Sequence, residues 1–141
     1  MRRTICNPID LPYRLQTGET DQDDPVLHPF REAADPSVVI FEGQYYLFAS
    51  QSGGYWYSDD LTEWTFVPVS EKQLPTIGGI GMHGWAPTAM VLDGYVHLLF
   101  SQRDMPDEGI YRTRTPKNPD TWEKMPNTTG MGWDPQFFYD I

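Results

Sequence analysis

The chain has 141 residues, with 20 acidic against 10 basic side chains and a formal net charge of −10 at pH 7. This charge argues against a nucleic-acid binder, whose phosphate contacts need clustered Lys and Arg, and against docking on anionic membranes. Aromatic residues make up 14% of the chain, which excludes wholesale disorder, and the length suits one ordinary domain. No apolar run approaches the roughly 20 residues of a membrane-spanning helix.

The N-terminal residues show no signal-peptide pattern, since Arg2 and Arg3 precede no apolar stretch. As written, the sequence therefore predicts a cytoplasmic protein, and secretion stays open if the N-terminus is incomplete. Cys6 is the single cysteine, so no intrachain disulfide or cysteine zinc site can form. The three histidines share no metal-ligand spacing, and the acidic run 21–24 lacks the spaced ligands of a calcium loop.

Short runs of β-branched and aromatic residues lie between the 13 Pro and 12 Gly residues. No stretch keeps an apolar period of 3.6 residues for long enough to predict a helix. The first part of the chain after residue 34 instead predicts an antiparallel meander of four short strands joined by tight turns. The predicted strands are 38–41, 44–50, 55–58 and 64–67.

The same unit recurs further along the chain. Residues 35–50 align with residues 86–101 without a gap, and the segments 109–114 and 122–125 supply two more strands. The alignment places Pro36 on Pro87, Ser37 on Thr88, Ser50 on Ser101, and the turn pair Glu42 and Gly43 on Asp93 and Gly94. A third copy of the unit begins further on, because Asp134 and Pro135 repeat Asp35 and Pro36. Four-stranded units repeating about every 50 residues are typical of β-propeller blades.

The sequence thus predicts an all-β fold, a β-propeller of which the chain forms about two blades plus the first strand of a third. The expected parts are a leading segment at 1–33, a first blade and its loop at 34–84, a second at 85–132, and the start of a third at 133–141. Propellers close with roughly four to eight blades, so this arrangement leaves apolar faces and strand edges open. We therefore expect a truncated product that self-associates.

Four pieces of sequence, in order and at blade spacing, resemble glycoside hydrolase family 43, the five-bladed propeller glycosidases. They are residues 34–50, 58–64, 85–87 and 133–140, and residues 7–14 are also similar to members of this group. The resemblance implies inverting hydrolysis of pentose-containing plant polysaccharide or oligosaccharide, of the α-L-arabinofuranosidase or β-xylosidase type. It implies no cofactor apart from a structural calcium in the channel, to which no residue here is assigned.

Inverting hydrolysis needs a carboxylate base for a water and a carboxylic acid for the leaving oxygen, about 6.5–9.5 Å apart. The first strands of propeller blades line the central channel, so acids at strand starts can converge on one substrate. By resemblance, Asp35 falls on the family's general base, and Asp134 falls on the Asp that tunes the pKa of the acid. The general-acid Glu has no counterpart, so we expect these 141 residues alone to show no turnover.

Four further residues are candidate substrate contacts. Trp85 and Trp133 lie at strand starts and could stack on a sugar face, although Trp residues of propellers often pack between blades. Arg31 lies just upstream of Asp35, with pairing to an acid as its alternative. His83 follows the glycine-rich stretch 78–82, where plain solvent exposure is the alternative. No metal ligand is predicted, and carbohydrate is the expected partner.

Other function classes remain beside the glycosidase. The main alternative is a non-catalytic carbohydrate-binding propeller fragment, which would keep the channel aromatics but not all of the acids. A scaffold for protein partners would not need Asp at the same place in two units. A retaining fructosidase would hold its Asp in an Asn-Asp-Pro-Asn-Gly setting, and residues 34–37 depart from that pattern.

Overall fold

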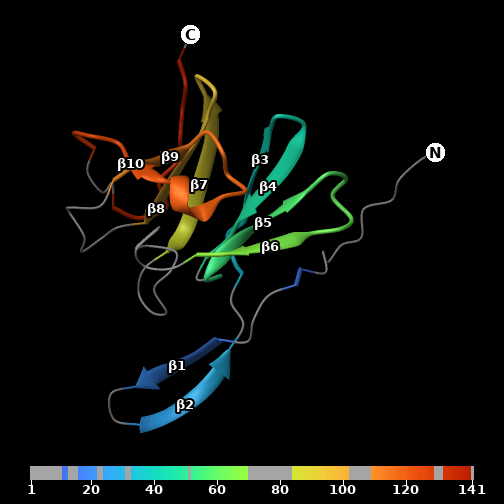
Figure 1. Ribbon diagram of the computed structural model, residues 1–141. Helices are drawn as coiled ribbons and strands as arrows, with labels where there is room; N and C mark the ends of the chain where they lie inside the picture. The colour runs from blue at the N-terminus through green and yellow to red at the C-terminus, as the bar shows by residue number, and fades with distance from the viewer. Residues whose placement is uncertain are drawn as a thin grey trace.

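The computed structural model describes residues 11–12, 16–21, 24–30, 33–50, 52–69, 84–101, 109–128 and 132–140. These residues form two four-stranded antiparallel sheets and a separate two-stranded hairpin (Figure 1). The single helical element in this part of the chain is the 3₁₀ turn η1 (Pro119–Thr121), capped by the Asn118 side chain, which accepts from the Asp120 N–H. No helix of the described ranges is long and apolar enough to cross a membrane.

The first sheet is a meander of consecutive strands, as the sequence predicted. It contains β3 (Ser37–Phe41), β4 (Gln44–Phe48), β5 (Gly54–Ser58) and β6 (Thr65–Pro68), paired in chain order. Glu42 and Gly43 join β3 to β4 with φ values of 50° and 78°. Two positive φ values in a two-residue loop are the conformation that matches the twist of a hairpin.

The second sheet repeats the first. It contains β7 (Trp85–Leu92), β8 (Tyr95–Ser101), β9 (Tyr111–Thr113) and β10 (Glu123–Lys124), again paired in chain order. Its first turn, Asp93 and Gly94, has φ values of 50° and 72°, which match those of the first sheet. The repeat seen in the sequence is therefore a repeat in backbone conformation as well.

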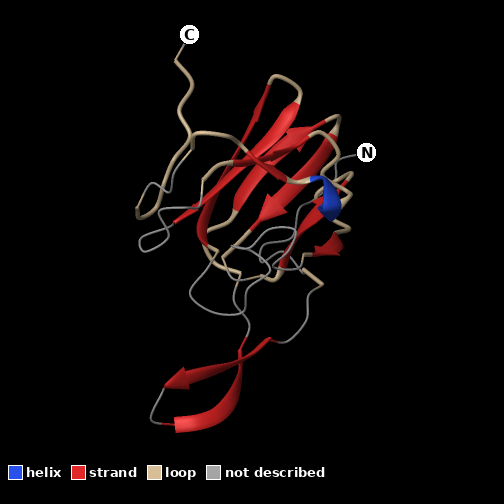
Figure 2. Cartoon of the chain, turned by 60° about the vertical axis from the view of Figure 1, so that its left-hand side comes forward, coloured by secondary structure: helices blue, strands red, loops and turns tan. Residues whose placement is uncertain are grey.

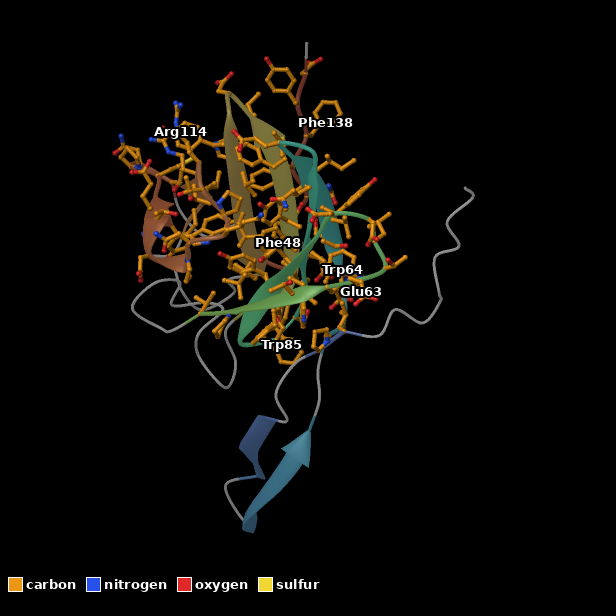
Figure 3. All side chains as sticks on the ribbon, turned by 45° about the vertical axis from the view of Figure 1, so that its right-hand side comes forward. Phe48, Glu63, Trp64, Trp85, Arg114 and Phe138 are labelled. Carbon is orange, nitrogen blue, oxygen red and sulfur yellow. The ribbon has the colours of Figure 1, made fainter. Side chains whose placement is uncertain are left out.

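The main core lies between the two sheets, which the side-chain view shows around Phe48 (Figure 3). Alternate residues of the central strands β4 and β8 point into it, because successive side chains of a strand face opposite sides. Its fully buried members include Phe48 and Tyr55 from the first sheet and Val96, Leu98 and Phe100 from the second.

A second cluster covers the other face of the first sheet, where Leu47, Ala49, Trp56 and Trp64 are buried. Leu11 packs against this cluster, and the Trp56 indole donates to the Pro12 carbonyl at 2.7 Å. Two side chains of β3 remain in solvent, since Val38 is 48% and Ile40 is 58% exposed. The first strand of this sheet, β3, therefore exposes apolar side chains.

Two features differ from the sequence prediction. The hairpin of β1 (Gln16–Asp21) and β2 (Asp24–Phe30) was not predicted, and it projects away from the two sheets (Figures 1 and 2). The strand predicted at 133–139 is wrong as a strand, because residues 133–140 carry no ladder within the described chain. No described strand pairs with this segment, and it is held instead by side-chain hydroxyls of the second sheet.

Candidate active site

Three segments that are far apart in sequence line one pocket of about 330 Å³: the starts of β3 and β7, and the segment that follows the second sheet. Each contributes three consecutive residues at the same position of the repeat: Asp35, Pro36 and Ser37; Ala86, Pro87 and Thr88; Asp134, Pro135 and Gln136. Strands β3 and β7 both run upward from this end of the sheets in Figure 1. The repeat thus places two carboxylates, Asp35 and Asp134, on the walls of a single pocket. In the second unit the equivalent residue is Ala86, which is uncharged.

The backbone has one unusual conformation at the equivalent position of the three segments. Asp35, Ala86 and Asp134 have φ values of 51°, 41° and 46°. Residues other than Gly rarely adopt positive φ, and such strain is concentrated at functional sites. Its occurrence at one repeat position in all three units indicates that the fold imposes the conformation there.

A buried serine holds Asp35. The Ser50 hydroxyl donates to Asp35 Oδ2 at 3.1 Å and accepts from the Ala86 N–H at 2.8 Å. Ser50 has no exposed surface, whereas Asp35 is exposed to the pocket. One hydroxyl therefore joins the carboxylate of the first unit to the main chain of the second.

The next junction has the same arrangement. Ser101, which is 7% exposed, accepts from the Asp134 N–H at 2.7 Å and lies 3.5 Å from Asp134 Oδ1. The sequence alignment had matched Ser50 with Ser101, but it gave neither residue a role. A hydroxyl kept at one position of both repeats was the signal that could have identified them.

A second pair of hydroxyls joins the units nearby. The Ala89 N–H donates to Ser37 Oγ at 3.0 Å, and the Phe137 N–H lies 3.5 Å from Thr88 Oγ1. Ser37 and Thr88 are equivalent in the repeat, as Ser50 and Ser101 are. Each junction between units therefore has two hydroxyl-to-backbone bonds beside the pocket.

The two tryptophans that were predicted to contact substrate do not line the pocket. Trp85 is 36% exposed at the start of β7, at the end of the sheets opposite Phe138 (Figure 3), and Trp133 is 62% exposed beside Asp134. Arg31 and His83 lie outside the described residues, so their predicted contacts stay predictions.

The described pocket has two carboxylates and no further acidic, histidine or cysteine side chain in its lining. Within the described part of the chain, no three His, Cys, Asp or Glu side chains lie close enough to hold a metal, whereas Ca²⁺ takes 6–8 oxygen ligands. The chemistry available from the pocket itself is that of two carboxylates. They can accept protons and hydrogen bonds from water and from hydroxyl groups of a ligand.

Comparison with known proteins gives a result at the level of structure. No protein-family model matches the sequence, and no curated protein matches it. The structure of the GH43 protein BlXynB from Bacillus licheniformis does match, with a TM-score of 0.55 and 22% identity over 77% of this chain and 25% of that one. The fold is that of part of a family-43 glycoside hydrolase propeller. The all-β partial propeller predicted from the sequence is thereby confirmed.

Two other solved structures are similar to the chain. A thermostable family-43 glycoside hydrolase has 24% identity and a TM-score of 0.48, over 66% of this chain and 32% of that one. An exo-1,5-α-L-arabinanase from a bovine ruminal metagenomic library has 26% identity and a TM-score of 0.42, over 70% and 36%. This chain therefore spans between 25% and 36% of the length of the three enzymes.

Proposed function

We propose that the pocket is part of the active site of an inverting glycoside hydrolase that acts on pentose-containing plant polysaccharide or oligosaccharide. The observation that carries the proposal is the pair of carboxylates, Asp35 and Asp134, at one repeat position and on one pocket. The family-43 fold supports it. The proposed type is an α-L-arabinofuranosidase or a β-xylosidase, as the sequence resemblance implies.

Asp35 is the proposed general base. Its Oδ2 accepts from Ser50, so Oδ1 is the oxygen that we assign to the water. The water oxygen forms a bond to the anomeric carbon while its proton passes to Asp35, and the glycosidic C–O bond breaks on the opposite face. The leaving oxygen takes a proton from a general acid, which the described pocket residues do not supply.

Asp134 has a different proposed role. A negative carboxylate near a carboxylic acid raises the pKa of that acid by like-charge repulsion, which keeps the acid protonated near neutral pH. Asp134 thus serves the leaving group, whereas Asp35 serves the water. The sequence leads us to expect no turnover by residues 1–141 alone, because the general acid is missing. A substrate that needs no acid removes this obstacle. A dinitrophenolate leaves without a proton, so a dinitrophenyl glycoside tests the base alone.

Sugar binding by the pocket is tested by NMR titration of the chain with arabinotriose, xylotriose and, as a control sugar, cellotriose. We expect the pentose oligosaccharides to shift the amide signals of Asp35, Ala86 and Asp134. The same titration of an Asp59→Asn variant, which alters an exposed acid outside this pocket, should give the same shifts. Shifts confined to other parts of the chain would contradict the proposal.

A further outcome separates the two candidate functions. If pentose oligosaccharides bind at the pocket but no dinitrophenyl pentoside is hydrolysed in an Asp35-dependent way, the chain is a carbohydrate-binding module and the catalytic proposal is wrong. Hydrolysis that depends on Asp35 would exclude that alternative.

A further inference from the structure

We propose that Ser50 and Ser101 are positioning residues, whose buried hydroxyls fix the two pocket carboxylates relative to one another. The inference rests on the proposed role of Asp35 as base. It concerns how the carboxylates are held across the junctions between units.

At the first carboxylate, the Ser50 hydroxyl uses both of its bonding modes. Its O–H is the donor to Asp35 Oδ2, and a lone pair of its oxygen accepts from the Ala86 N–H. The main chain of Ser50 is fixed beside Asp35 as well, because its own N–H donates to the Ala34 carbonyl at 2.8 Å. Within the described part of the chain, the Ser50 hydroxyl is the donor to the Asp35 carboxylate, and a hydrogen bond to a charged group is stronger than a neutral one.

The connection continues through the second sheet. Ala86 directly follows Trp85, and Trp85 is the residue paired with Ser101 across strands β7 and β8. Ser101 then accepts from the Asp134 N–H and lies beside Asp134 Oδ1. Asp35 and Asp134 are therefore connected through the hydrogen bonds of Ser50, the covalent link from Ala86 to Trp85, the pairing of Trp85 with Ser101, and the hydrogen bond to Ser101.

The path gives the serines a functional consequence. Small displacements of a catalytic group cost rate steeply, so a buried hydroxyl that holds the base in place protects the step in which the base activates water. The units are otherwise joined here by Ser37 and Thr88, whose bonds run to backbone N–H groups. Among the described residues, the Ser50 hydroxyl bonds the Asp35 carboxylate directly, whereas Ser101 holds the Asp134 main chain and has its hydroxyl 3.5 Å from Asp134 Oδ1.

Hydrogen exchange tests the contacts without any assay of activity. In Ser50→Ala, we expect the Ala86 amide to exchange at least about tenfold faster, which corresponds to the loss of a bond of about 1.4 kcal/mol, while the Asp134 amide is unchanged. In Ser101→Ala, the Asp134 amide should exchange faster and the Ala86 amide should be unchanged. Ser50→Thr, which keeps a hydroxyl, should restore slow exchange at Ala86.

A kinetic split tests the positioning role. With a 2,4-dinitrophenyl pentoside, Ser50→Ala should lower kcat by about 10- to 100-fold with KM within about twofold, since a displaced base slows the step but not binding. Ser58→Ala is the matched control, because Ser58 is a buried serine that bonds the Asp60 and Leu61 N–H groups outside this pocket. It should lose stability while its kcat stays at the wild-type value.

The outcomes distinguish this inference from the function on which it rests. An unchanged rate in Asp35→Asn would overturn the proposed base. A normal kcat in Ser50→Ala, beside an inactive Asp35→Asn, would overturn the positioning role alone. Unchanged exchange at Ala86 in Ser50→Ala would overturn the contact itself.

Discussion

The indole of Trp122 donates to the hydroxyl oxygen of Tyr55 at 3.1 Å, across the interface between the two sheets. The Tyr55 hydroxyl in turn donates to the Pro116 carbonyl at 2.6 Å. The two rings meet edge to face, with centroids 5.9 Å apart and an interplanar angle of 81°. Because Tyr55 is fully buried, one hydroxyl satisfies two polar groups that water does not reach.

Replacement of Tyr55 by Phe should therefore destabilise the fold beyond the loss of one average hydrogen bond. The variant leaves the Trp122 N–H and the Pro116 carbonyl buried without this partner, which costs about 1–3 kcal/mol per group. The free energy of unfolding, measured by urea denaturation, is the test. Tyr45→Phe, on the opposite face of the same sheet, is the control and should cost less. Equal losses in the two variants would contradict the account.

The fold should lose stability in alkali because of its buried tyrosines. Burial raises the pKa of Tyr46 to about 12 and raises the pKa of Tyr55 further, both from an ordinary value of 10.0. Since these pKa values are raised in the folded state, their contribution is complete below pH 10 and is lost as pH rises towards the folded values. Urea midpoints at pH 9, 10, 11 and 12 should fall above pH 10. The fall of the urea midpoint above pH 10 should be smaller in Tyr55→Phe than in wild type. An identical fall in both would show that Tyr55 does not cause the loss of stability.

His97 should make the fold sensitive to mild acid. Burial lowers the pKa of His97 from 6.5, and the nearby Arg112 lowers it further, against the opposing effects of Asp93 and the Tyr95 and Met90 backbones. A lowered folded pKa means that the stabilisation is present above pH 6.5 and is lost as pH falls below it. The difference in unfolding free energy between wild type and His97→Gln should shrink from pH 7.5 to pH 5. A constant difference would show that His97 is not buried in its neutral form.

Much of this fold could be predicted from local sequence, and the site could be predicted only in part. The residue types of the turn pairs Glu42–Gly43 and Asp93–Gly94 favour a tight turn, so the two meanders could be predicted from the sequence. The polar residues of β1 give no alternating pattern, so its hairpin was missed. The bond from Ser50 to Ala86 joins residues 36 apart through the packing of two sheets, and no local pattern encodes it. Residues 133–139 look like a strand by composition, but composition does not supply a pairing partner.

The two pocket aspartates should separate kinetically on a substrate that needs no acid. With a 2,4-dinitrophenyl pentoside, Asp134→Asn should retain most of the wild-type kcat, because its proposed partner is the acid that protonates the leaving group. Asp35→Asn should lose far more, because every turnover uses the base. Equal losses in the two variants, measured at one pH with matched thermal midpoints, would show that the roles are assigned wrongly.

The most direct test of the central claim is the turnover of 2,4-dinitrophenyl β-D-xyloside and α-L-arabinofuranoside by wild type, Asp35→Asn and Asp59→Asn. Loss of a general base typically costs about 10² to 10⁴ in rate, so Asp35→Asn should fall by that factor while Asp59→Asn matches wild type. The first-formed sugar, observed by proton NMR, should have the inverted anomeric configuration. Wild-type turnover by Asp35→Asn, or a retained anomer, would contradict the account.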